Sequence, residues 1–211
     1  MSEAQKKKPA GMRRTQQERR ETMQQTLLEA TLRCLGRRGY ASTSISEIIK
    51  EGGVSRGALL HHYPTKVDLV AAAIDHFYQE RLNRFQERLL GADSANLSLR
   101  QRLEVLRIDF RTWFPIGFEI IVAVRTNKDL QKAYHDLAKD RFEPMSQIYE
   151  KLFPEFATAK SPRLMISIVG TFLRGLCLED ITDDEGQADA VFNQFVEVLE
   201  FYYHHALHLQ A

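Results

Sequence analysis

Residues 44–63, SISEIIKEGGVSRGALLHHY, decide the fold because they form the pattern of two short helices joined by a glycine turn. Ser44 and Glu47 have the spacing of a capping box, in which each side chain binds a free backbone amide of the other residue. The isoleucines at 45, 48 and 49 then fall on a single helical face. The pattern predicts a short helix with one side to bury.

Gly52 and Gly53 predict the end of that helix, because glycine adopts the left-handed conformation of a helix C-terminus without a side-chain clash. Ser55 is a suitable cap for a second helix. Val54 and Leu59 are placed to hold the second helix against the first at a steep angle. The stretch therefore predicts a helix-turn-helix.

In a helix-turn-helix the second helix lies in the DNA major groove, where its outward side chains reach base edges. The expected outward residues are Arg56, Gly57, Ala58 and Leu60. Arg56 carries the donor fork that suits guanine O6 and N7. We expect His61, His62 and Lys66 to lie towards phosphates. The alternative interpretation is an ordinary helical hairpin whose histidines and lysine face solvent.

The run from Thr26 to about Phe77 resembles the DNA-binding domain of TetR-family transcriptional regulators. The resemblance rests on RRGYASTSISEII and GGVSRGALLHHYPTKVDLV, in order and spacing, over about a quarter of the chain. It implies DNA contacts from Ser44 and Ser46 as well. Leu60 departs from the aromatic or hydroxyl side chain that the family often has there. The remaining chain matches the family only in length and helicity.

The charge distribution separates two parts of the chain. Net charge is only +1, but residues 1–66 hold 13 Lys and Arg against 6 Asp and Glu, a balance of +7, and the remainder holds 16 against 22, a balance of −6. A positive head on a body that does not bind phosphate is the pattern of a DNA-binding protein. We predict a disordered basic arm at 1–14, a DNA-binding head at 15–66 and a ligand-binding and dimerisation body at 67–211.

The basic arm, with Arg13 and Arg14, is too polar to pack, and it either contacts DNA or acts as a solubilising tail. Thr15 and Glu18 form another capping box, which predicts a helix to about Arg38 that Gly39 ends.

Apolar residues at helical spacing continue to the end of the chain, without strand alternation, so the fold class is all-α. Pro64 ends the recognition helix, and the next helix runs to about Leu90. Pro115 is expected to end a helix that starts near Leu99, with a shorter helix at about 117–125. Pro144 is expected to kink or divide the helix from about Lys128 to Leu152. A further helix starts at Pro162, and residues 180–187 are expected to be an acidic loop before the last helix.

Cys34 and Cys177 lie in apolar contexts without metal-ligand spacing, so we expect them to be buried and reduced. The longest uncharged apolar stretch, residues 164–173, is too short for a bilayer, and the N-terminus has no apolar signal core. These features predict a soluble cytoplasmic protein with no membrane partner. The sequence indicates no cofactor.

The last two helices are apolar on more than one face, so we expect them to pair with the same helices of a second copy. The alternative is that they only close the monomer core. The predicted dimer-interface residues are Met165, Val169, Phe172, Leu176, Phe195, Leu199 and Tyr202.

The middle helices combine aromatic side chains with a few polar groups, which is typical of a small-molecule cavity. The candidate ligand-binding residues are Asp109, Trp113, Phe114, Phe118, Ile121, Val122, Arg125, Tyr134, His135 and Arg141. The alternative is that this aromatic cluster is ordinary core. By resemblance we expect a homodimeric repressor that binds an inverted-repeat operator in double-stranded DNA and is released by an unidentified small-molecule effector.

Three other functions compete with this one. An enzyme is disfavoured, since GGVSRG has Ala58 where a phosphate-binding loop has lysine, and no strand precedes it. His204, His205 and His208 lack an acidic third ligand, so a solvated helix end is expected and not a metal site. A helical adaptor that binds only proteins does not account for the charged head, and a DNA-binding activator stays open.

Overall fold

The computed structural model describes residues 15–89, 96–158, 161–182 and 186–208. Within these ranges the structure does not describe the side chains of residues 88–89, 138–143, 145, 157–158 and 206–208. The predicted basic arm, with Arg13 and Arg14, lies outside the described residues. The described ranges contain helices and no strand, so the all-α prediction is confirmed.

The first helix, α1 (Gln16–Ser42), starts at the predicted capping box. The Thr15 hydroxyl accepts a hydrogen bond from the Glu18 amide at 3.1 Å, and the Glu18 carboxylate accepts one from the Thr15 amide at 2.8 Å. The helix extends past the predicted end, but Gly39 has a φ of 69° and bends it there. The glycine therefore marks a bend, and one more helical turn follows it.

The helix-turn-helix forms as predicted, from α2 (Ile45–Gly52) and α3 (Arg56–His62). Ser44 and Glu47 make the capping box of α2, and Gly53 ends α2 in the left-handed conformation with φ 62° and ψ 30°. The Ser55 hydroxyl caps α3 by accepting from an amide 3.2 Å away. Local sequence signals therefore set every boundary of the motif.

The head has its own small core, shared by α1, α2, α3 and the first turns of α4 (Lys66–Leu89). Its fully buried members are Leu27, Ala30, Cys34, Ile48, Leu59 and Leu69. Because Leu69 belongs to α4, the predicted domain boundary after residue 66 passes through a helix that serves both head and body.

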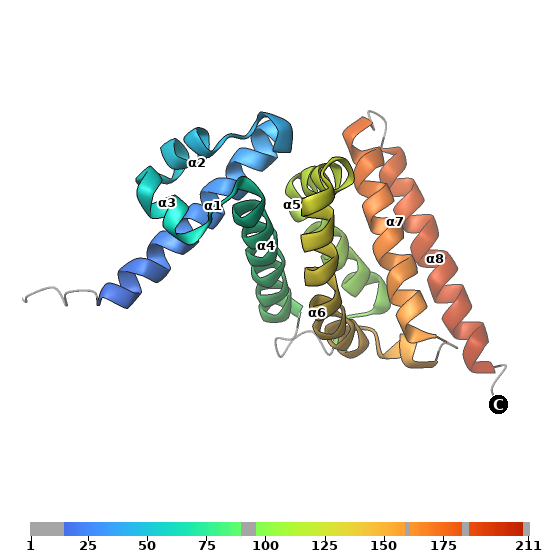
Figure 1. Cartoon of the computed structure of the whole chain (residues 1–211). Helices are drawn as coiled ribbons and strands as arrows, with labels where there is room; N and C mark the ends of the chain where they lie inside the picture. Colours follow the sequence, from blue (N-terminus) through green and yellow to red (C-terminus); the bar gives the residue numbers. More distant parts are fainter. Residues whose placement is uncertain (1–14, 90–95, 159–160, 183–185, 209–211) are drawn as a thin grey trace, which may run out of the picture.

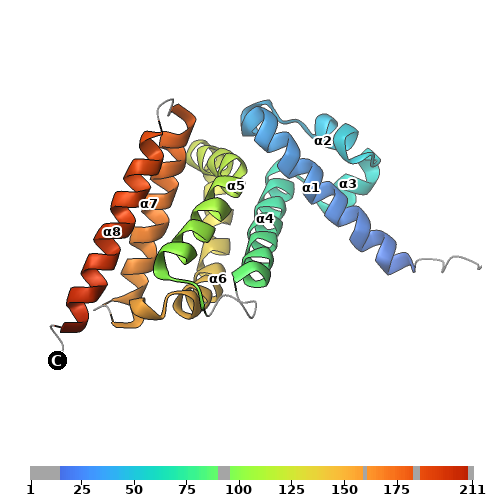
Figure 2. The same cartoon turned by 180° about the vertical axis from the view of Figure 1, so that it is seen from behind.

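The body is built from α4 and the helices that follow it (Figure 1). Their bounds are α5 (Leu99–Thr126), α6 (Lys128–Leu152), α7 (Pro162–Thr182) and α8 (Gln187–His208), with a 3-10 helix, η2 (Pro154–Thr158), after α6. Figure 1 and the reverse view in Figure 2 both place α4 between the helix-turn-helix and the rest of the body, with α7 and α8 side by side at the far end.

Three predicted boundaries in the body are wrong. Pro115 does not end a helix, because α5 continues through it to Thr126. Proline removes one backbone hydrogen bond, and burial on both sides of it, at Phe110 and Ile120, outweighs that loss. Likewise α6 is not divided at Pro144, so of the two outcomes predicted there only a kink remains open. The α7 helix extends to Thr182, so residues 180–182 are helical and not part of the predicted loop.

Candidate DNA-binding surface and effector cavity

The recognition helix α3 has one buried and one exposed side. Leu59 is fully buried and holds α3 against α1 and α2, whereas Leu60 is 38% exposed. The other predicted contact residues on the exposed side of the motif are Ser44, Ser46, Arg56, Gly57 and His61, and Ala58 is half-buried. No added Cβ at Gly57 would meet another atom within 4 Å, so the backbone of α3 is open to a close approach. These residues are therefore accessible to DNA, and their contacts with it stay a prediction.

Two predicted phosphate-facing residues point back into the protein. His62 Nδ1 lies 3.2 Å from Gln24 Nε2 on α1, and burial lowers the pKa of His62, as do the charges of Arg20 and His61. The Lys66 ammonium donates a 2.6 Å hydrogen bond to the Tyr40 carbonyl and lies 4.0 Å from the centre of the Tyr40 ring. Burial lowers the pKa of Lys66. Both side chains brace the head in this conformation.

The positive charge of the head is unevenly available. Arg33 and Arg37 both pair with Glu51, and Arg38 pairs with Glu47. These three arginines belong to the second half of α1, where they hold α2 in place. Their charges are already compensated within the protein.

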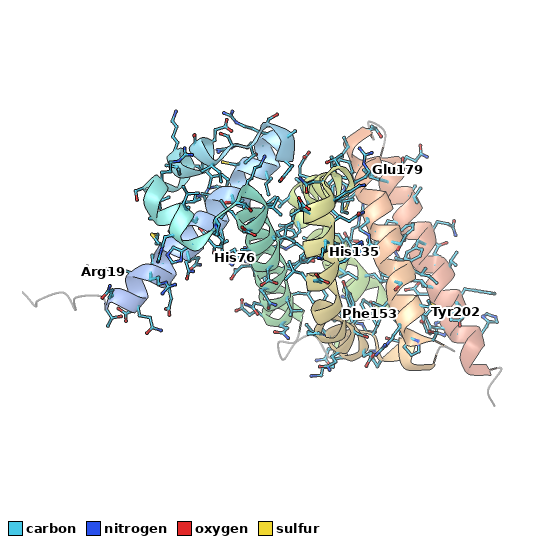
Figure 3. All side chains as sticks on the ribbon, in the orientation of Figure 1. Arg19, His76, His135, Phe153, Glu179 and Tyr202 are labelled. Carbon is cyan, nitrogen blue, oxygen red and sulfur yellow. The ribbon has the colours of Figure 1, made fainter. Side chains whose placement is uncertain are left out.

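Sequence reasoning missed the start of α1 as part of the basic surface. Arg19 and Arg20 are both exposed there, and the charge of Arg20 acts on His62 of α3. Figure 3 shows Arg19 near the free end of α1. The signal in the sequence was the arginine pair one turn after the Thr15 cap, but only the packing of α3 on α1 brings that pair beside the recognition helix.

A cavity of about 450 Å³ lies between α4, α5, α6 and α7. This volume is within the range of small-molecule sites. Rings and aliphatic side chains dominate the wall, with a few hydroxyls and two guanidiniums. The lining residues are Phe77, Tyr78, Arg81, Phe110, Trp113, Phe114, Gly117, Phe118, Ile121, Tyr134, Ser146, Tyr149, Ile166, Ser167, Gly170 and Arg174.

Half of the predicted ligand residues line this cavity: Trp113, Phe114, Phe118, Ile121 and Tyr134. The structure does not place Asp109, Val122, Arg125 or His135 in the wall, and the Arg141 side chain is outside the description. Asp109 is buried behind Arg81, and Arg125 and His135 are exposed. Figure 3 shows His135 on α6. Helical spacing identified the aromatic stripe but could not say which polar neighbours turn inwards.

Two helices contribute lining residues that the sequence analysis missed. Phe77, Tyr78 and Arg81 come from α4, and Ser167 and Arg174 come from α7. The apolar neighbours of Ser167 and Arg174 on α7 had been assigned to the dimer surface. Only the tertiary arrangement places these two helices around the cavity.

The predicted dimer interface needs correction. Val169, Leu176 and Leu199 are at most 4% exposed, because they fill the core of the monomer. Met165, Phe172 and Phe195 are half-buried, with the two phenylalanine rings stacked at 3.7 Å. Among the predicted residues Tyr202 is exposed, and Figure 3 shows it on α8. The outer apolar side chains of α7 and α8 are instead Leu164, Ile168, Leu178, Ile181, Val191, Val198, Phe201 and Tyr202.

The remaining candidate groups are the histidines near the end of α8, of which the side chain of His208 is not described, and the two cysteines. Across the described ranges no group of three metal-ligating side chains occurs, and His205 Nδ1 lies 2.9 Å from its own helix at the Phe201 carbonyl oxygen. Both cysteines are buried and unpaired, and burial raises the pKa of Cys177 to about 11. Within the same ranges no helix has the length and apolar character to cross a membrane.

Comparison with known proteins agrees with this arrangement. Residues 27–73 match the family described as bacterial regulatory proteins, tetR family. The chain is 26% identical over 189 residues to the HTH-type transcriptional regulator CymR of Pseudomonas putida, a match that covers 88% of this chain and 93% of CymR.

Two solved structures share the fold. A transcriptional regulator from Saccharomonospora viridis, solved in complex with choline, superposes with a TM-score of 0.62 at 18% identity, over 84% of this chain and 96% of that one. The reduced form of E. coli NemR gives a TM-score of 0.65 at 16% identity, over 84% and 95% of the two chains.

The helix-turn-helix, its exposed recognition surface and these matches lead to one identification. Residues 27–73 match the DNA-binding domain of the tetR family of bacterial regulatory proteins, and the chain is a DNA-binding transcriptional regulator and not an enzyme.

Proposed function

We propose that this regulator is a homodimeric repressor that a small molecule in the α4–α7 cavity releases from an inverted-repeat operator. The observation that carries the proposal is the double role of α4. Its first turns complete the core of the head at Leu69, and its later turns line the cavity with Phe77, Tyr78 and Arg81. A ligand in the cavity therefore contacts the helix that follows the recognition helix directly.

The operator contacts that we propose lie on the exposed side of the helix-turn-helix. Arg56 is exposed and makes no hydrogen bond or ion pair within the described residues, so its fork is available to a guanine. Gly57, Leu60 and His61 extend this surface along α3, and Ser44 and Ser46 extend it at the start of α2. Lys66 is a brace in this conformation, so we place it outside the set of phosphate contacts.

The dimer surface that we propose is the outer face of α7 and α8. Ile168 is 51% exposed, and Val198 and Phe201 are 56% and 65% exposed. An apolar stripe of this kind on two adjacent helices is a typical protein-interaction surface. On α7, Thr171 and Gly175 lie between Ile168 and Leu178, and an added Cβ at Gly175 would meet nothing within 4 Å. A partner helix can approach closely there.

Release by a ligand requires that the ligand bind one arrangement of the two heads more tightly than another. The shift between the two arrangements cannot exceed that difference in affinity. Because Phe77 and Tyr78 are directly behind the head core on α4, a displacement of α4 by the ligand would move both recognition helices. In an activator the ligand would favour the arrangement of the two heads that binds DNA.

The test is the selection of bound fragments from random duplex DNA by the purified protein, followed by titration of the selected site at several salt concentrations. An enriched inverted repeat with steep salt dependence supports a dimeric sequence-specific regulator. Weak and uniform binding without enrichment would contradict this function and favour a protein-binding adaptor.

The dimer surface has its own test, by sedimentation of the Ile168→Glu variant. We expect monomers, because a carboxylate at this place would be buried without a partner in the dimer. The matched control is Ile108→Glu, which changes an isoleucine on α5 that is 50% exposed. It should stay dimeric, and dissociation of the control alone would locate the interface elsewhere.

A further inference from the structure

The charged groups of the effector cavity are of one sign. Among the described lining residues the charged side chains are Arg81 on α4 and Arg174 on α7. The other polar groups of the wall are hydroxyls, of Tyr78, Tyr134, Tyr149, Ser146 and Ser167. No described carboxylate lines the cavity, so its wall favours an anion.

One of the two guanidiniums is neutralised within the protein. Arg81 Nη2 lies 3.0 Å from Asp109 Oδ2, and Arg81 Nε donates a 3.1 Å hydrogen bond to the same oxygen. Both side chains are nearly buried, so this pair is screened little by solvent. Arg174, in contrast, donates to the Thr171 hydroxyl at 3.0 Å and has no ion pair in the described part of the chain. The pair leaves the cavity with one uncompensated positive charge.

Both guanidiniums belong to the cavity wall, and Arg174 is the more exposed of the two residues. The charges of Arg81 and Arg174 both lower the pKa of the Tyr149 phenol, against the larger effect of burial, which raises it. Gly170 leaves room beside them, since a Cβ built there would lie 3.6 Å from Arg174 Nη1 and 3.8 Å from Phe110 Cζ.

Aromatic side chains make up a second part of the cavity wall. The rings of Phe77 and Trp113 meet edge to face at 5.3 Å, and the hydroxyls of Tyr78 and Tyr134 are 3.1 Å apart. These rings form an angled apolar wall with hydroxyl groups beside it. A flat ring in the ligand would bury its area there.

Aromatic walls also suit cationic ligands, but here the chain's own arginines already lie over the rings. The Arg81 guanidinium lies 4.5 Å from the centre of the Phe110 ring, and the Arg84 guanidinium 5.3 Å from that of Trp113. An ammonium group would have to compete with these guanidiniums for the ring faces, and like charges repel it.

We propose that the effector of this regulator is a small aromatic carboxylate, with its carboxylate on Arg174 and its ring against Phe77 and Trp113. Planar guanidinium forks match carboxylates with two parallel hydrogen bonds, which makes arginine the suitable anchor. This assignment rests on the proposed function, because it names the class of ligand that the cavity would sense.

The test is calorimetric titration of the purified protein, without DNA, with three matched probes: 3-phenylpropionate, its uncharged amide 3-phenylpropionamide, and the cation 3-phenylpropylamine. We expect the carboxylate to bind at least about tenfold more tightly than the amide, which corresponds to about one charged hydrogen-bonded contact. The amine should bind weakest. Tighter binding of the amide or the amine, or binding of none of the three at millimolar concentration, would overturn the assignment.

The anchor is tested with Arg174→Gln and Arg174→Lys. The glutamine variant should lose the preference for carboxylate over amide, and lysine should restore part of it. The matched control is Arg163→Gln, an exposed arginine of α7 that does not line the cavity, and it should keep the full preference. An unchanged preference in Arg174→Gln, with its thermal stability intact, would show that the charge does not select the ligand.

A parallel titration of the protein–DNA complex separates the two proposals. Binding of the carboxylate without any effect on DNA affinity would leave the ligand class standing and overturn ligand-controlled release. Release of DNA by the amine but not by the carboxylate would leave the regulator standing and overturn the ligand class.

Discussion

The head and the body of this regulator bury their apolar surface in different ways. In the head, α2 and α3 are short, each begins at a serine cap, and a core of six small or aliphatic side chains holds them. In the body the helices have more than 20 residues each, and stacked rings such as Phe153 on Phe156 fill the core, beside buried arginines and an open cavity. The head is specified by local signals, whereas the body depends on long-range packing.

This difference suits the tasks that we propose for the two regions, DNA binding by the head and ligand binding by the body. A surface that reads DNA has to be rigid, and caps on both helices fix it over a few residues. A ligand-responsive body needs space and more than one stable arrangement, and a large cavity next to a helix shared with the head provides both. The predictions below test the difference, from the largest expected effect to the smallest.

The core of the head is the first place to test it, with Leu59→Ala. Truncation of a fully buried leucine should lower the free energy of unfolding by about 2 to 5 kcal/mol. Urea denaturation, with hydrogen exchange to locate the loss in α1, α2 and α3, measures it. The neighbouring Leu60→Ala is the matched control, because Leu60 is 38% exposed and should change stability by less than about 0.5 kcal/mol. Similar losses in both variants would mean that α3 is not anchored by its inner face.

The reading surface is tested with Arg56→Ala at the selected operator. We expect a loss of about 1 to 3 kcal/mol in binding free energy and a relaxed base preference at one position, because Arg56 carries the donor fork of α3. Binding to a set of single-base operator variants measures both effects. An equal loss on every sequence would reassign Arg56 to a phosphate. Arg125→Ala, at an exposed position on the body, should leave operator affinity unchanged.

Local capping is tested with Ser55→Ala. The Ser55 hydroxyl accepts a hydrogen bond from the Ala58 amide. Its loss should lower the free energy of unfolding by about 0.5 to 2 kcal/mol. Chemical denaturation of the protein without DNA measures this value. Ser55→Asp keeps a capping oxygen and should retain most of the stability. No loss in the alanine variant would show that α3 is held by packing alone.

The smallest expected effect is the loss of stability of the head at acidic pH. Hydrogen bonds from the Ser44 amide and hydroxyl lower the pKa of Glu47 below its usual 4.5, with Arg38 adding to the shift. A carboxyl whose folded pKa is lowered stabilises the fold above its unfolded pKa, and this stabilisation is lost as pH falls through the folded pKa. The head should therefore weaken below about pH 4.5. Glu47→Gln should flatten that pH dependence in melting temperatures between pH 3 and 6, and an unchanged slope would exclude this carboxyl.

The sequence predicted the structure of the head better than that of the body, for a physical reason. The capping boxes at Thr15 and Ser44, the glycine at 53 and the cap at Ser55 act within four residues, so the sequence revealed them directly. In the body, Pro115 was expected to end a helix, but burial at Phe110 and Ile120 keeps α5 continuous. Three residues that were predicted to lie in the dimer interface, Val169, Leu176 and Leu199, are buried in the monomer core, because a helix that is apolar all round does not reveal which side meets its own monomer.

By itself, the sequence determined the all-α class, the helix-turn-helix and the outward position of Arg56, because these depend on hydrogen bonds and spacings inside one or two helical turns. Only the tertiary structure decided that α4 joins the core of the head to the wall of the cavity. It also decided that Arg81 pairs with Asp109, whereas Arg174 has no ion pair among the described residues. These features arise where helices distant in the sequence meet, and the spacing within one helix carries no information about the charge that a neighbouring helix places beside it.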